Sequence, residues 1–307
     1  MRKVIGIGET VLDIVFRNGV PTGAVPGGST FNTMVSLGRM GIPAMFLTDV
    51  GDDKVGQIMC DFMQENGVDD SLVCVHPEVQ SPISLAFLDE QSHADYEFYR
   101  YPYPDDPEYE LPEVHSDDLV VFGSYYALAP AHRERVTALL ARARTAGALI
   151  VYDINFRQNH QAEAVKLTGA LLENLEYADI VRGSDEDFRI LYGTSDTAAV
   201  YRKHTAFYCP RLIATCGKEG VDLYAGTLSK HYPALPTVVV STIGAGDSFN
   251  AGIIWGLLQA RIRQQDLDTL SENDWDAIIR CGNAFSADTC ASEENYVRKG
   301  FCIDKIL

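Results

Sequence analysis

The stretch from Val240 to Gly252 holds the residues whose types and spacing best suit a chemical reaction. Three small residues, Gly244, Ala245 and Gly246, come before Asp247, and apolar residues at helical spacing follow. The first N–H groups of a helix bind anions, and small residues leave those groups open. A carboxylate in such an anion site makes sense if it removes a proton from a hydroxyl group that attacks a phosphate. The motif therefore predicts phosphoryl transfer to an alcohol.

A strand before this motif and a helix after it must hold it in place. The β-branched run Thr237–Val240 predicts that strand. Along most of the chain, short apolar runs alternate with helical patterns, which predicts a parallel sheet flanked by helices. Ligands of such sheets bind beyond the carboxyl ends of the strands. Several polar residues follow predicted strands, although strand ends are also where ordinary polar residues belong: Glu9, Asp13, Asn155, Arg157, Ser184 to Asp187, Thr215 and Gly217.

The pattern changes between residues 72 and 101, where polar and apolar residues alternate without a helical stripe. Ile83–Leu88 and Tyr96–Tyr101 predict two strands joined by a polar loop at Asp89–Ala94. Together with residues near 12–25, the segment 82–101 predicts a small antiparallel sheet that lies apart from the main sheet as a lid. The alternative is an edge hairpin packed on the main sheet. No repeat or linker interrupts the chain, so residues 1–307 are expected to form a single α/β domain.

Two glycine pairs lie near the start of the chain, and the first invites a dinucleotide-binding interpretation. Gly6 and Gly8 lack the third glycine and the following helix of a dinucleotide fingerprint, and no stretch matches a Walker P-loop. Gly27 and Gly28 come before a predicted helix that runs to Met40, with Ser29 or Thr30 as its N-cap. Taken alone, this second pair predicts only a turn.

Composition excludes some classes of partner. The net charge of −18 argues against nucleic acid, because phosphate contacts require clustered Lys and Arg. No apolar run approaches the roughly 20 residues of a membrane span, and the first residues do not resemble a signal peptide. The seven cysteines are scattered without a C-x-x-C pair, and the seven histidines show no metal-binding spacing. We therefore expect a cytoplasmic protein with neither a nucleic-acid nor a membrane partner.

Several motifs together resemble one family. Val240–Gly256 is similar to the C-terminal signature of the ribokinase-like (PfkB-type) carbohydrate kinases, and Pro26–Gly41 is similar to their N-terminal signature. Further matches run along the whole chain: Gly8-Glu9 with Asp13, Val50–Gly56, Asp153-x-Asn155-x-Arg157, Thr215-x-Gly217-x-x-Gly220, and Asn283. The resemblance implies a ribokinase-like α/β fold, with a mainly parallel central sheet flanked by helices and a small antiparallel β lid.

The resemblance also implies a role for each matched residue. Asp247 would be the general base, and this catalysis would raise the rate by about 10²–10⁴-fold. The N–H groups of Gly244, Ala245 and Gly246 would stabilise charge on the transferred phosphoryl group. Each donor would raise the rate by about 10²–10³-fold. Closure of the lid would exclude water. The remaining matches divide between the sugar (Asp13, Gly28 and Asn32) and ATP (Thr215, Gly217, Gly220 and Asn283), with Mg²⁺ as the metal.

Within the family, the chain most resembles the fructokinase and 2-keto-3-deoxygluconate kinase branch, because of Tyr96–Arg100 and the Asp153–Arg157 motif. Arg100 and Arg157 would then reach a substrate oxygen or an ATP phosphate. The alternative for Arg100 is a salt bridge on an exposed strand. We predict an ATP-dependent, fructokinase-like sugar kinase. The alternatives are a 2-keto-3-deoxygluconate kinase, a nucleoside kinase, and a catalytically silent sugar- or nucleotide-binding protein. By analogy with the family, the lid predicts a homodimer.

Two departures from the family pattern change what is expected at the edges of the site. Relatives commonly carry Asn-x-x-Glu, a motif tied to Mg²⁺, where this chain has Ser184 and Asp187. These residues keep oxygen atoms at the nucleotide and metal positions, but with a shorter reach. Members activated by a monovalent cation often carry Asp and Thr at the positions of Ser241 and Ile243. We therefore predict weak or absent dependence on K⁺.

Overall fold

The computed structural model describes residues 2–88, 94–100 and 109–303. Its main sheet has the strand order β14-β13-β12-β11-β10-β9-β1-β4-β5, and β6 pairs with β4. All neighbouring strands are parallel except the pairs β12–β13 and β13–β14. The predicted, mainly parallel sheet is therefore confirmed. The bounds are β1 Val4–Ile7, β4 Ala44–Gly51, β5 Val68–Asp69, β6 Val73–His76, β9 Leu119–Gly123, β10 Leu149–Asp153, β11 Ile180–Ser184, β12 Arg211–Thr215, β13 Val221–Ala225 and β14 Leu228–Tyr232.

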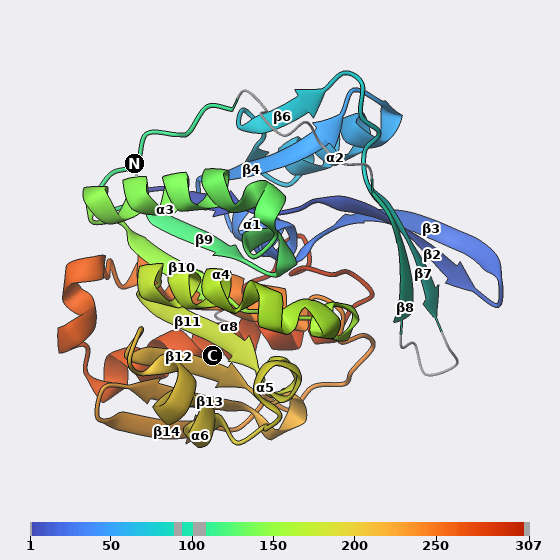
Figure 1. The fold of residues 1–307 in the computed structure, drawn as a ribbon. Helices are drawn as coiled ribbons and strands as arrows, with labels where there is room; N and C mark the ends of the chain where they lie inside the picture. Colours follow the sequence, from blue (N-terminus) through green and yellow to red (C-terminus); the bar gives the residue numbers. More distant parts are fainter. Residues whose placement is uncertain (1, 89–93, 101–108, 304–307) are drawn as a thin grey trace.

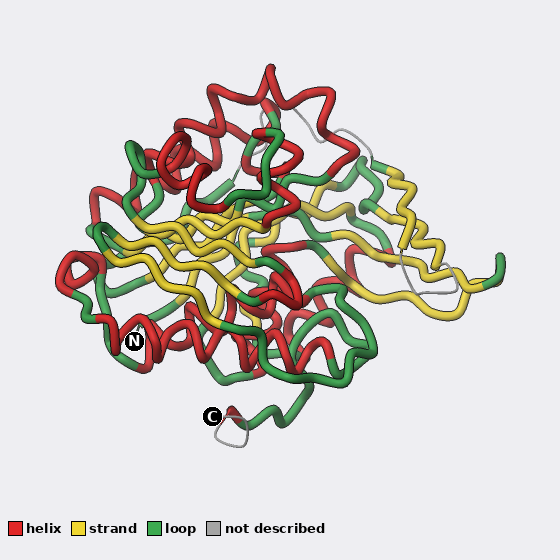
Figure 2. The backbone as a smooth tube through the Cα atoms, turned by 90° about the horizontal axis from the view of Figure 1, so that it is seen from below, coloured by secondary structure: helices red, strands yellow, loops and turns green. Residues whose placement is uncertain are grey.

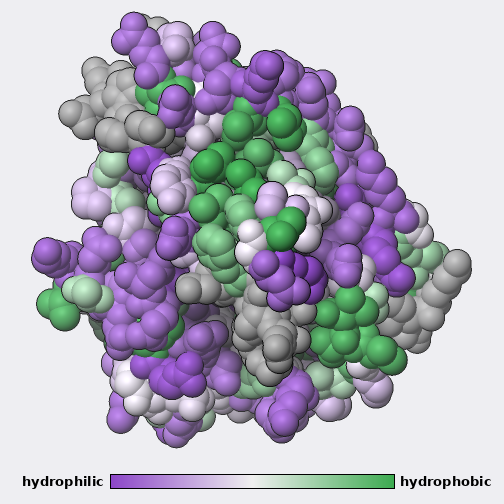
Figure 3. Space-filling model, turned by 90° about the vertical axis from the view of Figure 1, so that its right-hand side faces the viewer, coloured by the Kyte–Doolittle hydropathy of each residue, from purple (hydrophilic) through white to green (hydrophobic). Residues whose placement is uncertain are grey.

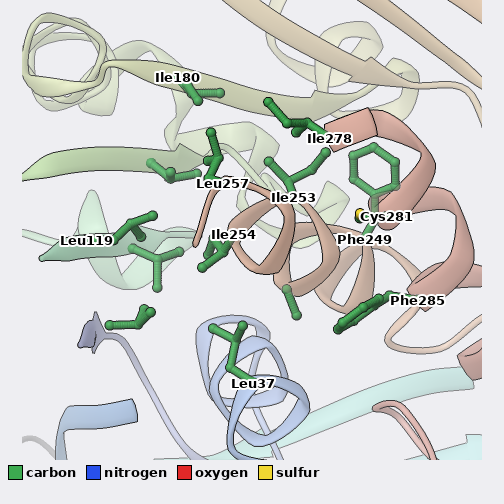
Figure 4. Close-up of a cluster of buried hydrophobic side chains, with 14 of the residues drawn as sticks. Leu37, Leu119, Ile180, Phe249, Ile253, Ile254, Leu257, Ile278, Cys281 and Phe285 are labelled. Carbon is green, nitrogen blue, oxygen red and sulfur yellow. The ribbon is translucent and has the colours of Figure 1, made fainter. Parts of the chain in front are cut away.

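Helices cover both faces of this sheet, as seen from two directions in Figures 1 and 2. One face carries α1 (Ser29–Arg39), α7 (Ala245–Gln259) and α8 (Glu272–Cys290), whose buried side chains share one apolar core. In that core, shown in Figure 4, Ile254 and Leu257 of α7 lie between the sheet and Leu37 of α1. Every residue of β1, β9 and β10 is buried, as expected for strands covered on both faces.

The opposite face of the sheet carries α3 (Arg133–Ala146), α4 (Ala164–Tyr177) and α5 (Asp185–Tyr192), which enclose a second apolar core. Two more helices are α2 (Lys54–Glu65) and α6 (Thr197–Val200). No helix of the described residues is long and apolar enough to span a membrane. Short helical turns complete the described chain at Tyr125–Ala127, Pro130–His132, Gln158–Glu163, Tyr201–Thr205, Gly217–Glu219 and Gln264–Thr269.

A second sheet of four strands, in the order β3-β2-β7-β8, projects from the main domain (Figure 1). Its strands are β2 (Val11–Arg17), β3 (Val20–Gly27), β7 (Ile83–Leu88) and β8 (Ala94–Tyr99). The pairs β2–β3 and β7–β8 are antiparallel, whereas the central pair β2–β7 is parallel. The sheet is thus separate from the main sheet, as predicted, and is not an edge hairpin. Residues 89–93 of the predicted loop lie outside the described residues.

Two local predictions are wrong. Thr237–Val240 is not a strand but an extended loop, in which Val238 is 86% exposed. The loop crosses from β14 to α7 without a partner strand, and the Val240 N–H donates instead to the Cys290 carbonyl at 2.8 Å. At the start of α1, the N-cap is Gly28 and no side chain caps the helix. The Ser29 hydroxyl is directed to another helix, where it serves the site described next.

Candidate active site

Asp247 lies where the first turns of α1 and α7 meet. Its carboxylate is buried and accepts two hydrogen bonds from α1. Asn32 Nδ2 donates to Oδ2 and Ser29 Oγ donates to Oδ1, each at 2.8 Å. The Thr33 hydroxyl donates to the Asp247 carbonyl at 3.0 Å, which fixes the backbone of α7 against α1. The two signature motifs, far apart in the sequence, therefore form one site.

The electrostatic surroundings of Asp247 suit a general base. Burial raises the pKa of its carboxyl group to about 6, and the negative charge of Asp153 adds to the rise. The hydrogen bonds from Asn32 and Ser29, together with the positive charge of Arg157, act in the opposite direction and lower this pKa. A base with a pKa near the working pH is both available in its ionised form and strong enough to take a proton.

The glycines of the anion loop are required by close packing as well as by access. Gly244 is the N-cap of α7 with φ of 75°, and a Cβ atom there would lie 1.9 Å from the Asn295 carbonyl oxygen. A Cβ atom on Gly246 would lie 2.6 Å from Nη2 of Arg182. Ala245 N–H makes a 3.3 Å hydrogen bond to the Thr242 carbonyl. Gly246 lies in the first turn, where N–H groups have no partner within the helix.

Asp13 faces the site from strand β2 of the lid. Ser84, its direct neighbour on the parallel strand β7, donates a hydrogen bond to Oδ1. Burial raises the pKa of Asp13 to about 6. The Ser84 hydrogen bond lowers it, and the charge of Glu9 adds to the rise. Gly28 has φ of 129°, and a Cβ there would lie 2.3 Å from the Glu9 carbonyl, so the start of α1 can approach this loop only with glycine.

A buried acceptor beside Asp247 has no hydrogen-bond partner in the described part of the chain. Asn32 donates through Nδ2 to Asp247, but its Oδ1 has no hydrogen-bond partner among the described residues. Buried acceptors are almost always satisfied, so such an atom beside Asp247 marks a position for a donor from a ligand.

The lid contributes an aromatic wall. Tyr96 and Phe98 of β8 stack at 5.9 Å between ring centroids, and Phe98 pairs with Ser84 on the face that carries Asp13. Burial, with the charges of Asp13 and Asp247, raises the pKa of Tyr96 to about 12; the charge of Arg157 acts the other way. Tyr96 is therefore close enough to feel both carboxylates of the site.

The two predicted arginines differ. Arg100 forms an ion pair with Glu9, with Nε 2.6 Å from Oε1 and Nη2 2.8 Å from Oε2, and lies 4.3 Å above the Phe98 ring. The salt bridge on an exposed strand is thus present. The side chain of Arg157, exposed just after β10, makes no hydrogen bond or ion pair within the described part of the chain, yet its charge reaches Asp247 and Tyr96.

The predicted nucleotide residues follow β11 and β12. Ser184 and Thr215 are direct neighbours in the parallel register at the ends of these strands. Gly217 has φ of 53° and open space around its Cβ position, whereas a Cβ on Gly220 would lie 2.0 Å from the Tyr232 carbonyl. Asn283, on α8, donates to the Pro233 carbonyl at 3.4 Å.

Asp187, the predicted metal ligand, forms the N-terminal capping box of α5 together with Ser184. Its Oδ2 accepts from the backbone N–H and the hydroxyl of Ser184 at 2.7 and 2.8 Å, and Oδ1 accepts from Phe156 N–H at 2.7 Å. The side chain is buried. Within the described residues no group of three or more His, Cys, Asp or Glu side chains could hold a metal ion. The role of Asp187 at a metal stays a prediction.

Sequence reasoning did not single out Ser29, Asp153 and Arg182 as a connected group. Arg182 Nη1 donates to Asp153 Oδ1 at 3.0 Å, and Nη2 donates to the Thr215 hydroxyl at 2.6 Å. Asp153 Oδ2 lies 3.3 Å from Ser29 Oγ. The available signal was an arginine in the middle of the core strand Ile180–Ser184, where a charged residue is unusual.

Sequence comparisons match the chain to carbohydrate kinases. A family model described as pfkB family carbohydrate kinase matches residues 2–296. The fructokinase of Rhizobium leguminosarum bv. trifolii is 31% identical over 270 residues, covering 83% of this chain and 79% of that protein. The fructokinase of Klebsiella pneumoniae is 28% identical over 259 residues, covering 83% and 84%.

Solved structures show the same fold. Fructokinase from Vibrio cholerae O395, in a form with bound fructose, ADP and calcium ion, has a TM-score of 0.82 at 21% identity, covering 96% of this chain and 94% of that one. Aminoimidazole riboside kinase from Salmonella enterica has a TM-score of 0.79 at 24% identity, covering 96% and 95%. Two signatures meeting at Asp247, a matching fold and a family match over nearly the whole chain lead to one conclusion: the protein belongs to the pfkB family of carbohydrate kinases.

Proposed function

We propose that the protein is a fructokinase-like enzyme, which transfers the γ-phosphoryl group of ATP to a hydroxyl group of a neutral sugar. The observation that carries this proposal is the placement of Asp247, a buried carboxylate with a pKa of about 6, in the first turn of α7 and hydrogen-bonded by Ser29 and Asn32. There it would take the proton of the attacking hydroxyl, while the Gly246 N–H stabilises charge on the phosphoryl group.

The surroundings of Asp247 favour a polyol. Asp13 offers a carboxylate acceptor, and Asn32 Oδ1 is an unsatisfied acceptor beside the base. Both would accept hydrogen bonds from sugar hydroxyl groups. Arg100 is neutralised by Glu9, so an acidic sugar would meet only Arg157 as a free cation in the described site. This balance favours a neutral sugar over a keto-deoxy acid, and two of the relatives compared above are named fructokinases.

ATP would lie beyond the ends of β11 and β12, against Ser184, Thr215, Gly217, Gly220 and Asn283. When bound, Mg²⁺ would neutralise charge on the phosphates. This ion usually keeps several waters and needs only one or two carboxylates, which suits a site without a three-carboxylate cluster. Since both Asp187 oxygens already accept hydrogen bonds, we propose that this side chain holds the α5 turn near the ion. Use of ATP and seven free cysteines support a cytoplasmic location.

A coupled assay of ADP release over ketoses, aldoses, keto-deoxy acids and nucleosides tests the substrate class. We expect the highest kcat/KM with fructose, and less than about a twofold change when K⁺ is replaced by a bulky cation at constant ionic strength. Preference for a keto-deoxy acid or a nucleoside would overturn the assignment to a neutral sugar. Turnover with none of these compounds would leave a silent binding protein as the better description.

The Asp247→Asn variant tests the chemistry itself. We expect kcat to fall by at least about 10²-fold, the range of general base catalysis, while the sugar still binds. Thr22→Ala, a substitution on the exposed lid strand β3, serves as a control that should keep its activity. Undiminished turnover of Asp247→Asn would rule out this residue as the base.

A further inference from the structure

Arg182 is a buried charge in the middle of the core strand β11. The strand is otherwise apolar or small, and its neighbours in the sheet are β10 and β12. Asp153 lies directly opposite Arg182 on β10 and accepts from Nη1 at 3.0 Å. A buried ion pair contributes little net stability compared with apolar residues of similar volume, so the fold alone does not explain why this pair is present.

The guanidinium group of Arg182 faces the anion loop. It occupies the space behind Gly246, because a Cβ atom on that glycine would lie 2.6 Å from Nη2 and 3.0 Å from Nη1. Through Asp153, Arg182 also connects to the base: Asp153 Oδ2 lies 3.3 Å from Ser29 Oγ, which donates to Asp247 Oδ1 at 2.8 Å. Arg182, Asp153, Ser29 and Asp247 therefore form a continuous polar chain beneath the site.

The charged groups around Asp247 determine how easily its carboxyl group ionises. Asp153 on β10 disfavours the ionised form of Asp247, whereas Arg157, just after β10, favours it. Arg182 on β11 feels the charges of Asp153, of Asp187 on α5 and of Asp247. The Tyr96 phenol, on β8, feels the charge of Asp247. Without Arg182, two buried carboxylates joined through one hydroxyl group would compete for a single proton.

We propose that Arg182 is a positioning residue for phosphoryl transfer: by pairing with Asp153 it directs the Ser29 hydroxyl to Asp247 and keeps that carboxylate ionised when the sugar binds. The proposal rests on the proposed role of Asp247 as general base. It predicts that Arg182 controls the acid side of the pH–rate profile without touching either substrate.

The test is the pH dependence of kcat/KM, from about pH 5 to about pH 9, for four variants. In the wild type we expect activity to fall below about pH 6, where Asp247 is protonated. Arg182→Gln should move this fall to higher pH by about one unit, because it leaves Asp153 uncompensated. Arg182→Lys should restore most of the wild-type profile. Asp153→Asn alone should move the fall to lower pH, because Asp153 raises the pKa of Asp247. Combined with Arg182→Gln, it should return the fall to the wild-type position or below.

A merely structural role would give a different result. Arg135→Gln is the matched control, because Arg135 forms another buried ion pair, with Asp49 at 2.8 Å, on α3. It should lower the melting temperature without moving the profile. If Arg182→Gln lowered kcat with the fall still at the wild-type pH, the proposal would be overturned. If that variant does not fold, Asp153→Asn decides: a profile that stays in place or moves to higher pH overturns the proposal.

Failure of the proposed function and failure of the role of Arg182 would give different results. Full activity of Asp247→Asn would show that Asp247 is not the general base. The proposed role of Arg182, which depends on that base, would then also be wrong. Loss of activity in Asp247→Asn, together with an unmoved profile in Arg182→Gln or Asp153→Asn, would remove only the role of Arg182 and leave the proposed function standing.

Discussion

At the scale of single residues, the site combines features that oppose stability. Asp13 and Asp247 are buried carboxylates, and the pKa of each is raised to about 6, mainly by burial. A carboxyl group with a raised pKa in the folded state favours folding at low pH and opposes it once the pH exceeds that pKa. The protein therefore holds two carboxylates in positions where their charge destabilises the fold at neutral pH, which is common where a residue serves chemistry.

The sign of this effect can be tested with Asp247→Asn. At about pH 8 the neutral amide removes the cost of the buried charge, so the free energy of unfolding should rise by on the order of 1–3 kcal/mol. The gain should shrink as the pH falls through 6 and vanish near pH 4, where the wild-type carboxyl is protonated in the folded protein. Urea unfolding at both pH values measures it. Equal or lower stability of the variant at about pH 8 would contradict this account.

At the scale of elements, a contact between two strands of the lid lowers the pKa of Asp13. The parallel register of β2 and β7 places Ser84 directly beside this carboxylate, and its hydrogen bond lowers the pKa of Asp13. Register is decisive here, because a shift by one residue would turn Ser84 to the other face of the lid.

Ser84→Ala tests this arrangement. Loss of the donor should raise the pKa of Asp13 further, so that less of the carboxylate is available to accept from the sugar at neutral pH. We expect the KM for the sugar to rise by about tenfold at pH 7, with a smaller rise at about pH 8.5 and a small change in kcat. Thr22→Ala on β3 removes a lid hydroxyl that bonds the Val15 carbonyl and should leave KM unchanged. An equal rise at both pH values would contradict a role through Asp13.

At the scale of the whole molecule, we propose the outer face of the lid as the surface through which a second copy of the chain would bind. Phe16 and Phe87 pack at 5.0 Å on neighbouring strands, and Phe87 is 37% exposed. Figure 3 views the molecule from the side to which the lid projects, and apolar side chains gather near the middle of that view. The homodimer that we expect from the family would cover them. Dimer formation is opposed by the net charge of −18 on each copy, because like charges repel at long range.

Light scattering at several salt concentrations tests this balance. We expect a dimer at physiological ionic strength that dissociates at low salt, because screening falls as the Debye length grows from about 8 to about 30 Å. Phe87→Ser should weaken the dimer. Phe207→Ser changes a residue that is 90% exposed on another part of the surface and should not weaken it. A monomer at every salt and protein concentration would exclude a lid-mediated dimer.

The sequence by itself determined the family, the main sheet and the residues at the centre of the site. Alternating apolar runs and helical patterns predict a parallel sheet because both follow from local periodicity. The motifs around Asn32 and Asp247 could be recognised because backbone lies close to Gly28 and Gly244, and the Arg182 guanidinium group lies close to Gly246, so that few other residues fit at these positions. The strand predicted at Thr237–Val240 failed because β-branched residues favour extended backbone but cannot supply a partner strand.

Only the tertiary structure decided how charges are shared around Asp247. Ser29, one of the two predicted N-cap residues of its own helix, instead donates its hydroxyl to a carboxylate 218 positions away. Arg182 and Asp153 are adjacent only because β10 and β11 pair in one register, and Glu9 neutralises Arg100 only because the lid folds back over the first loop. Such contacts depend on distances across the fold. The pKa values that they set therefore follow from the packing of the elements, which no local pattern in the chain encodes.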